Sequence, residues 1–320
     1  MGFGESKQAA PAAAPTPTPA PSKVFDKPWR DAHWNGRDQL LEDLRAYVPR
    51  NPDIEHVRIL LDGPVGVGKS SFINSINNVL QNKMTMKAQV DSANADRSFT
   101  TKYKTHKIEN RKTGSYYPFV FNDVMGFEQK SGKGVHEDDL IKALTGHVEE
   151  GHKFNPSYSL TEGDLGYNKS PSPSDRTHCL VSLIPADKIT VMDDDVIKKM
   201  RAIRVVASEL GIPQMVILTR VDMACPLVKE GLRAMYLSKY IKETMEKCSM
   251  RLGVPVNCIF PVRNYHEEID LDKDMDVLLL RALKQMVDFG DDFLKEMEQS
   301  QTKLVPKLST PSVYSMPAIV

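Results

Sequence analysis

The sequence predicts an α/β fold in which helices cover both faces of a mainly parallel sheet. From about residue 57 onward, short continuous apolar runs alternate with amphipathic helical segments. This alternation is typical of buried parallel strands that are joined by helical crossovers. At 320 residues, the chain is also long enough to bury a large core.

The composition excludes several classes of protein. Lys and Arg total 42, and so do Asp and Glu, so the zero net charge disfavours a nucleic-acid binder or a polybasic membrane protein. No apolar run reaches the length of a membrane span, about 20 residues. The four cysteines lack metal-site spacing and predict reduced thiols. Without a secretory leader pattern, we expect a cytoplasmic protein.

Two flanking segments are predicted to lie outside the folded part. Residues 1–25 contain the stretch KQAAPAAAPTPTPAPS, and because proline lacks an N–H and this stretch has no core-forming residues, we expect a disordered arm. Residues 300–320 predict a flexible tail. The opening residues MGFGES match the myristoylation template on Gly2, and whether that glycine is modified stays open.

Residues 26–52 predict a helical segment that packs on the main domain. Four apolar residues share one face of a helix over 38–48: Leu40, Leu41, Leu44 and Val48. Trp29 and Trp34 precede this helix; one interpretation is that they hold it against the main body, and the favoured alternative is that they are ordinary packing residues.

The main domain is predicted to span residues 53–299. Its strands are expected at 57–61, 101–108 (an edge strand), 117–121, 179–184, 215–218 and 258–262. Its helices are expected at 70–80, 137–149, 196–210, 237–252 and 275–297, the last with a break near Gly290 left open. The glycine- and serine-rich stretch 128–175 predicts an insertion, which at this length is functional or mobile.

The sequence GPVGVGKS at residues 63–70 matches the phosphate-binding pattern G-x-x-x-x-G-K-[ST] in full. A buried strand precedes it and a helix follows, as that loop requires. Glycines allow the backbone amides to converge on phosphate oxygens at a helix N-terminus. A lysine neutralises phosphate charge and a serine hydroxyl binds Mg²⁺. The predicted nucleotide contacts of this loop are Gly63, Val65, Gly66, Val67, Gly68, Lys69, Ser70 and Ser71.

Two further motifs follow predicted strands. Asp123 and Gly126 come after strand 117–121, where a carboxylate holds Mg²⁺ and a glycine N–H reaches a γ-phosphate; the alternative is a turn with a solvated Asp. One hydroxyl of Thr100 or Thr101 would complete the metal coordination, and the sequence does not choose between them. The predicted metal ligands are therefore Ser70, Asp123 and Thr100 or Thr101.

The stretch TRVD at residues 219–222 follows strand 215–218. Asp222 would accept hydrogen bonds from guanine N1–H and the N2 amine, a donor pair that adenine lacks. Thr219 and Arg220 would lie beside the base, the latter by stacking its guanidinium plane. Arg263, after the last strand, stands where a backbone amide would touch guanine O6. The alternative for each is a strand-end turn.

These motifs together resemble the guanine-nucleotide-binding fold of translation-factor-like GTPases, a P-loop NTPase sandwich of three layers. The stretches PWRDAHW, GPVGVGKSSFINSI, SFTTKYKTH, NDVMGFE, ILTRVD and FPVRNY narrow the resemblance to the interferon-induced protein 44 and 44-like family, over residues 29–294. The resemblance implies a cytoplasmic, GTP- and Mg²⁺-binding protein of interferon-induced antiviral defence. Its partners would be a second copy of the chain or an immune signalling protein.

Whether GTP is hydrolysed is left open. Phe127 stands directly after Gly126, where many GTPases have a water-orienting glutamine. Lys69, Thr101 and Glu128 are the remaining catalytic candidates, and we expect slow or partner-assisted hydrolysis. One alternative is an immune scaffold that nucleotide stabilises without a reaction cycle. Another is an ATP-dependent enzyme, against which Asp222 argues.

Overall fold

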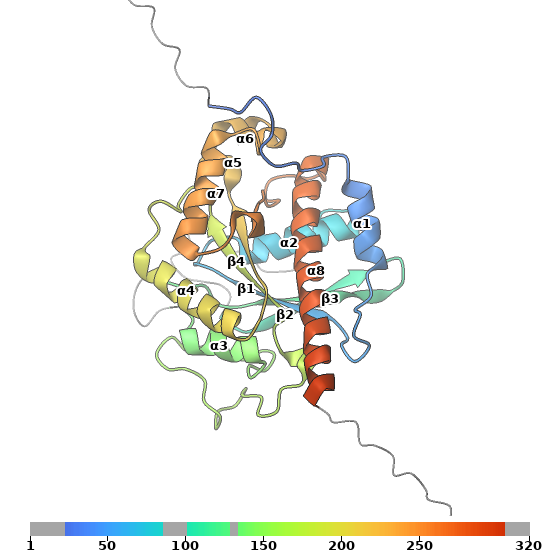
Figure 1. Cartoon of the computed structure of the whole chain (residues 1–320), viewed down its shortest axis with the longest axis vertical. Helices are drawn as coiled ribbons and strands as arrows, with labels where there is room; N and C mark the ends of the chain where they lie inside the picture. The colour runs from blue at the N-terminus through green and yellow to red at the C-terminus, as the bar shows by residue number, and fades with distance from the viewer. Residues whose placement is uncertain (1–22, 86–100, 129–133, 305–320) are drawn as a thin grey trace, which may run out of the picture.

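The structure, a computed structural model, describes residues 23–85, 101–128 and 134–304. Its centre is a six-stranded sheet with the order β2-β3-β1-β4-β5-β6 (Figure 1). The strands are β1 (Val57–Asp62), β2 (Lys104–Asn110), β3 (Ser115–Asp123), β4 (Cys179–Pro185), β5 (Gln214–Thr219) and β6 (Ile259–Pro261). All neighbours pair in parallel except β2 and β3. The predicted mainly parallel α/β fold is confirmed.

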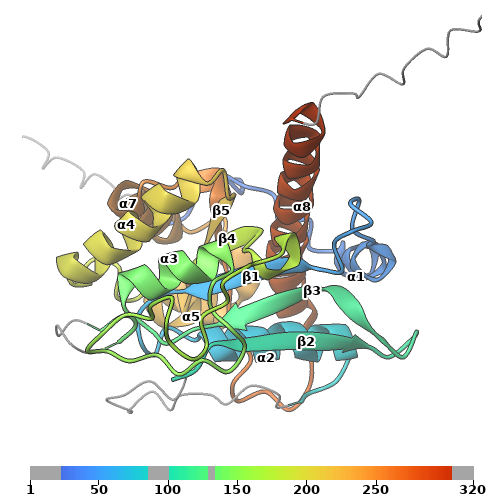
Figure 2. The same cartoon turned by 90° about the horizontal axis from the view of Figure 1, so that it is seen from below.

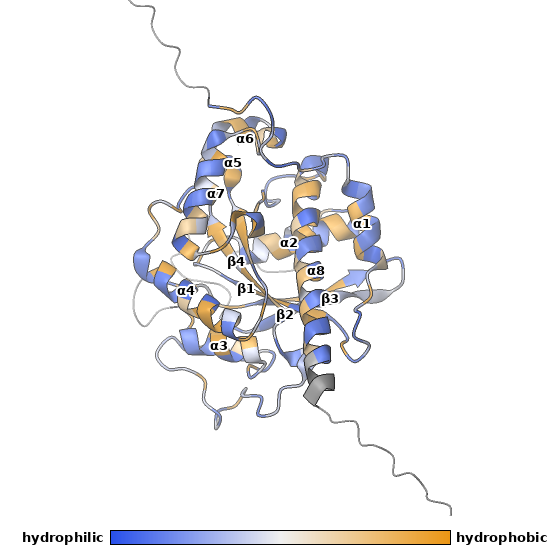
Figure 3. Cartoon of the chain, in the orientation of Figure 1, coloured by the Kyte–Doolittle hydropathy of each residue, from blue (hydrophilic) through white to orange (hydrophobic). Residues whose placement is uncertain are grey.

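Helices form the two outer layers. They are α1 (Arg37–Ala46), α2 (Lys69–Gln81), α3 (Glu137–Thr145), α4 (Asp194–Glu209), α5 (Val221–Ala224), α6 (Pro226–Glu230), α7 (Lys239–Leu252) and α8 (Lys273–Leu304). Short 3-10 turns lie at Pro173–Asp175, Leu232–Ala234 and Val256–Cys258. Helix α8 contacts α1 and α2, whereas α4 contacts α3 and α7 on the other side of the sheet (Figures 1 and 2). In Figure 3 hydrophobic colour marks the central strands, and the surrounding helices carry both hydrophobic and hydrophilic residues.

The segment before α1 is attached to the main domain by backbone and ring contacts. The Trp29 N–H donates to the Tyr236 carbonyl at 3.1 Å, and the two rings meet edge to face with centroids 5.5 Å apart. Arg30 donates to the carbonyls of Ile259 and Val256 at the start of β6. Both tryptophans, Trp29 and Trp34, pack against the core, in keeping with the position expected for them.

One predicted core residue of α1 is wrong. Leu41 and Leu44 are buried, but Val48 is 74% exposed. The helix ends at Ala46 and Tyr47 is already extended, because Val48 precedes a proline, which disfavours the helical conformation for the residue before it. Val48 therefore leaves the helical face on which the periodicity placed it.

Two helix ends also differ from the sequence prediction. Helix α3 stops at Thr145 instead of 149, because Gly146 takes a left-handed conformation (φ 86°) that ends the helix. Helix α8 continues through Gly290 without a break. A Cβ at Gly290 would lie 2.4 Å from Val57 Cγ1, so the glycine permits close packing of α8 on β1.

The described part of the predicted insertion 128–175 is packed against the edge of the sheet. The Tyr103 N–H donates to the His152 carbonyl at 2.8 Å, and the Gly151 N–H donates to the Tyr103 carbonyl at 2.9 Å. Phe154 and Leu160 are buried. The side chain of Asp139 in α3 accepts the Leu160 N–H at 2.7 Å. Residues 134–175 therefore form an ordered flap next to β2.

Several predictions concern residues that the structure does not describe. They are the first 22 residues of the arm with the modification of Gly2, the hydroxyl of Thr100, and the tail beyond residue 304. These remain predictions.

Candidate functional site

The loop between β1 and α2 forms a cradle at the carboxyl end of the sheet. Gly63, Gly66 and Gly68 all have positive φ (141°, 72° and 97°), which favours glycine. A Cβ at Gly63 would lie 2.5 Å from the Leu183 carbonyl oxygen, whereas one at Gly66 would meet no atom within 4 Å. The loop is thus packed on one side and open on the other. It ends at the N-terminus of α2, where backbone amides favour anions.

The predicted metal ligands at the end of β3 and the start of α2 lie together. Ser70 Oγ donates to Asp123 Oδ2 at 2.8 Å, and the Asp123 side chain is almost completely buried. A hydroxyl and a carboxylate are the oxygen ligands that Mg²⁺ prefers, so these residues fit the metal that the motif implies. Within the described ranges, the Thr101 hydroxyl makes no hydrogen bond to either residue; the Thr101 carbonyl accepts the Phe154 N–H.

The segment after Asp123 is bonded directly to the phosphate loop. The Phe127 N–H donates to the Gly63 carbonyl and the Val65 N–H donates to the Phe127 carbonyl, both at 3.0 Å. A Cβ at Gly126 would lie 2.7 Å from the Val65 nitrogen. Phe127 is 2% exposed and Glu128 is partly buried. Phe127 therefore forms part of the wall of the site.

Lys69 is buried within the same loop. Its Nζ donates to the Gly63 carbonyl at 3.4 Å. Directly before the loop, Asp62 is fully buried at the end of β1. Burial raises the pKa of Asp62 to about 6, and the Ser182 hydroxyl and the Lys69 charge oppose this shift. No sequence motif includes Asp62, so sequence reasoning missed it.

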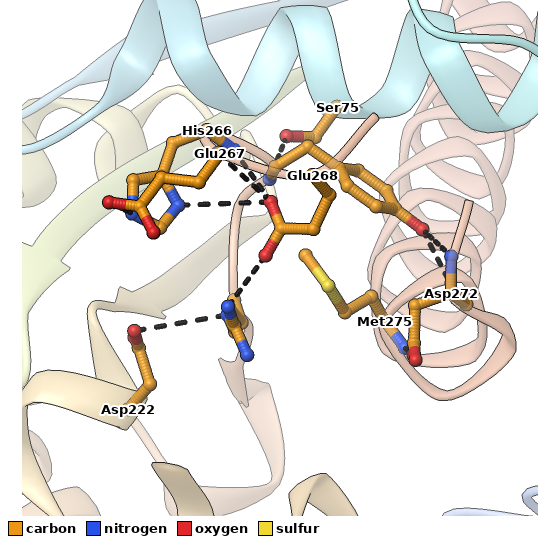
Figure 4. Close-up of polar contacts among 9 residues, drawn as sticks. Ser75, Asp222, His266, Glu267, Glu268, Asp272 and Met275 are labelled. Carbon is orange, nitrogen blue, oxygen red and sulfur yellow. Dashed lines mark hydrogen bonds and ion pairs between the residues drawn. The ribbon is translucent and has the colours of Figure 1, made fainter. Parts of the chain in front are cut away.

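The predicted base-reading residues lie at the carboxyl ends of β5 and β6. Thr219 Oγ1 donates to the Val67 carbonyl at 2.9 Å, which joins β5 to the phosphate loop. Arg220 adopts a left-handed conformation (φ 58°) and its guanidinium lies 2.8 Å from Asp187 Oδ2. Asp222 is largely buried, with Oδ2 3.8 Å from Arg263 Nε. The structure thus brings Asp222 and Arg263 together (Figure 4).

Two residues that were not predicted as ligands complete this end of the site. Asn264 Nδ2 donates to the Gly68 carbonyl at 3.2 Å, and Glu268 Oε1 accepts from Arg263 Nη2 at 2.6 Å. Asn264 directly follows Arg263 in the sequence, and this position is the feature by which the sequence alone could have indicated it. No sequence pattern points to Glu268, because its contact with Arg263 depends on how the loop after β6 folds back.

Comparison with known proteins finds relatives over most of the chain. The human "Interferon-induced protein 44" is 34% identical over 265 residues, which are 83% of this chain and 59% of the relative. The human "Interferon-induced protein 44-like" is 30% identical over 277 residues, 87% of this chain and 61% of the relative. The chain therefore spans about 60% of the length of these curated relatives. No protein-family model matches it.

Solved structures give weaker likenesses. Toc33 from Arabidopsis thaliana in complex with GDP and Mg²⁺ has a TM-score of 0.45 at 13% identity, covering 81% of this chain and 97% of that one. A probable GTP-binding protein engB has a TM-score of 0.40 at 13% identity, covering 75% and 99%. These TM-scores are too low to support the fold assignment, which depends instead on the order of the strands and on the phosphate loop of this chain. In the part of the chain that the structure describes, no helix is both long and apolar enough to span a membrane.

Proposed function

The chain is homologous over most of its length to the interferon-induced proteins 44 and 44-like, and we propose that it binds GTP or GDP together with Mg²⁺. The observation that carries this proposal is the hydrogen bond of 2.8 Å between Ser70 and Asp123 beside the glycine cradle. Phosphate would bind the amides of loop 63–70 and Lys69, and the metal would bind Ser70 and Asp123. Gly126 would offer its N–H to the γ-phosphate.

The base would bind at the carboxyl ends of β5 and β6. Asp222 would accept from guanine N1–H and the N2 amine, which adenine does not offer. This chemistry favours GTP over ATP and argues against an ATP-dependent kinase or ATPase. Arg220 is already paired with Asp187, which would hold its side chain beside the base.

Titration calorimetry with GTP, GDP and ATP, with and without Mg²⁺, tests the proposal. Lys69→Ala should weaken GTP binding at least tenfold, because a charge-assisted contact to phosphate contributes about 1.5–3 kcal/mol. Lys198→Ala is the matched control, since Lys198 lies on α4 with a side chain that is 75% exposed. Thermal unfolding of each variant establishes that it is folded. Folded wild-type protein that ignores millimolar GTP would refute the proposal.

We further propose that any hydrolysis is slow or is completed by a second subunit or partner. Phe127 has no group that can orient water, and its backbone is bonded to Gly63 and Val65. Lys69, Thr101 and Glu128 are the remaining candidates for a catalytic role. In single-turnover assays, Phe127→Gln should hydrolyse GTP faster than wild type. Fast hydrolysis by the wild-type monomer would contradict this idea.

The same contacts favour a second candidate function, a scaffold protein that bound nucleotide stabilises and that goes through no cycle of GTP hydrolysis. The segment 126–127 is already hydrogen-bonded to the phosphate loop. Binding of the terminal phosphate of GTP would therefore change the conformation of this segment little. Protease sensitivity near Gly126 in GTP and in GDP distinguishes the two functions: a difference supports a switch, and identical patterns support the scaffold. In either case we propose a role in the interferon-induced antiviral response, on the strength of the homology.

A further inference from the structure

The guanidinium of Arg263 contacts two carboxylates at the base end of the site, those of Glu268 and Asp222, both labelled in Figure 4. Its Nη2 donates to Glu268 Oε1 at 2.6 Å, and its Nε lies 3.8 Å from Asp222 Oδ2. The first contact is a short hydrogen bond, whereas the second is an ion pair beyond hydrogen-bond distance. Arg263 is therefore held mainly by Glu268, and it leaves Asp222 able to accept other donors.

The remaining donors of Arg263 lie next to the carboxylate that would read the base. An arginine side chain carries five N–H groups and no acceptor. In the described part of the chain, Arg263 Nη1 has no hydrogen-bond partner. On guanine, the O6 acceptor is the direct neighbour of N1–H. A donor beside Asp222 would therefore lie near O6 when Asp222 binds N1–H and the N2 amine.

We propose that the Arg263 side chain reads guanine O6 and that Glu268 is the positioning residue that holds it there. This inference rests on the proposed binding of guanine nucleotide. Arginine pairs readily with guanine O6 and N7, and at the position of O6 adenine presents an amine, which a guanidinium cannot bind. Asp222 and Arg263 together would then read all three groups on this edge of the base.

Glu268 is fixed for this task by its own loop. Its Oε2 accepts the backbone N–H groups of His266 at 3.0 Å and Glu267 at 3.2 Å. Burial raises its pKa, but these backbone bonds and the Arg263 charge outweigh it and keep the pKa of Glu268 below its usual value. The carboxylate is therefore ionised when it holds Arg263.

The loop that carries both residues is anchored to α2. The Tyr265 N–H donates to Ser75 Oγ at 2.9 Å, a bond drawn to the labelled Ser75 in Figure 4. The Tyr265 hydroxyl donates to Asp276 Oδ1 of α8 at 2.7 Å. Because α2 starts at the phosphate loop, the bond to Ser75 fixes the loop that carries Arg263 relative to the phosphate cradle.

Binding of GTP, 6-thio-GTP and ITP by calorimetry tests the assignment, because each analogue alters one group of the base. Sulfur at position 6 is a weak acceptor, and inosine lacks the N2 amine. Arg263→Gln should weaken GTP binding roughly tenfold and should bring the GTP and 6-thio-GTP affinities close together. It should leave the ratio of GTP to ITP affinity unchanged, whereas Asp222→Asn should reduce that ratio.

Glu268→Gln should change the same ratio of GTP to 6-thio-GTP in the same direction, by a smaller factor. The double variant of both residues should match Arg263→Gln, since Glu268 acts through Arg263. Glu267→Gln is the matched control, because that neighbouring side chain is 83% exposed and pairs with His266 rather than with Arg263. Arg263→Met, which fills similar space but has no donor, is a second variant in case Arg263→Gln unfolds or its amide replaces the lost contact.

The outcomes separate the two proposals. Wild-type protein that binds none of the three nucleotides refutes the proposed function and this inference with it. Wild-type protein that prefers GTP to 6-thio-GTP, with the preference retained in folded Arg263→Met, which has no donor, refutes the inference alone. A preference that is lost in the Arg263 variants but kept in Glu268→Gln refutes the positioning role of Glu268.

Discussion

At the residue scale, Asp62 shows the energetic cost of placing a carboxylate inside the sheet. It is fully buried between the core of β1 and the phosphate loop, and its pKa is about 6. An unfolded aspartic acid has a pKa near 3.9. The folded state therefore binds a proton more tightly than the unfolded state, and at neutral pH the ionised Asp62 destabilises the fold.

Asp62→Asn should raise the free energy of unfolding at pH 7 by about 2–3 kcal/mol, because the neutral amide avoids the cost of burying a charge. The gain should shrink as the pH falls below 6, where Asp62 in the fold becomes protonated and neutral. Urea denaturation of both proteins at pH 7 and pH 5 measures the difference. If Asp62→Asn instead lowers the stability at pH 7, the carboxylate makes favourable contacts that outweigh its burial.

The residues of the site were predictable to unequal degrees. The phosphate loop has a fixed spacing within eight residues, so the sequence alone indicated Gly63, Lys69 and Ser70 as residues of the candidate site. Asp123 was located because a carboxylate at the end of a parallel strand has a known position. Glu268 was not predictable, since its contact with Arg263 depends on a turn whose geometry no short pattern specifies.

At the element scale, the position of α8 depends on one glycine. Gly290 lies where α8 crosses β1, with Val57 and His178 as its neighbours. Read locally, a glycine in a helix suggests a weak point, because it costs about 1 kcal/mol relative to alanine. In the fold this cost is offset by the close contact between helix and strand that only an absent side chain allows.

Gly290→Ala should lower the free energy of unfolding by about 1–3 kcal/mol, since the new methyl group would overlap Val57 Cγ1 and overpack the core. Helix propensity alone predicts the opposite sign. Chemical denaturation of the single variants and of Gly290→Ala combined with Val57→Ala gives the coupling. A double variant that is as stable as Val57→Ala would identify Val57 as the clashing group, and a stabilised single variant would contradict the close contact.

Most elements were predictable because their periodicity is local. Apart from the alternating edge strand β2, the strands of the sheet read as short apolar runs, and α7 ends at Gly253 as expected. The errors in the predicted helices arose where tertiary contacts or neighbouring residues determine the local conformation. These places are Val48 before a proline, Gly146 at the end of α3, and Gly290 in α8. Helices α5 and α6 were missed because four or five residues are too few to show a period.

At the scale of the whole molecule, a buried polar cluster joins the sheet to the flap. The Arg58 N–H donates to His178 Nδ1 at 2.9 Å, and His178 Nε2 donates to the Pro173 carbonyl at 2.9 Å. These bonds use the neutral form of the ring. Burial and the Arg58 charge lower the pKa of both His178 and His56 to about 4, so both are neutral in the folded protein at pH 7.

The pH dependence of stability follows from these shifts. Both histidines have a lower pKa in the fold than in the unfolded chain, so the unfolded state takes up protons first as the pH falls from about 6.5 to 4. Asp62 acts in the opposite direction over part of this range. We expect wild-type protein to lose on the order of 2 kcal/mol of unfolding free energy between pH 7 and pH 5.

Urea denaturation at half-unit steps of pH measures this loss. His56→Gln should make it smaller, because glutamine does not titrate, and Asp62→Asn should make it larger, because the opposing group is removed. A stability that is flat across this range in wild-type protein would contradict the assignment of neutral buried histidines.

The flap beside β2 also has a consequence for self-association. An outermost strand with free amides invites another polypeptide to extend the sheet, which is a common route to aggregation. Here the amide and hydroxyl of Thr105 donate to the carboxylate of Glu150, and Tyr103 exchanges backbone bonds with residues 151 and 152. The start of this outer strand, at residues 103–105, is therefore already paired, so a second polypeptide that extends the sheet there would have to displace the flap.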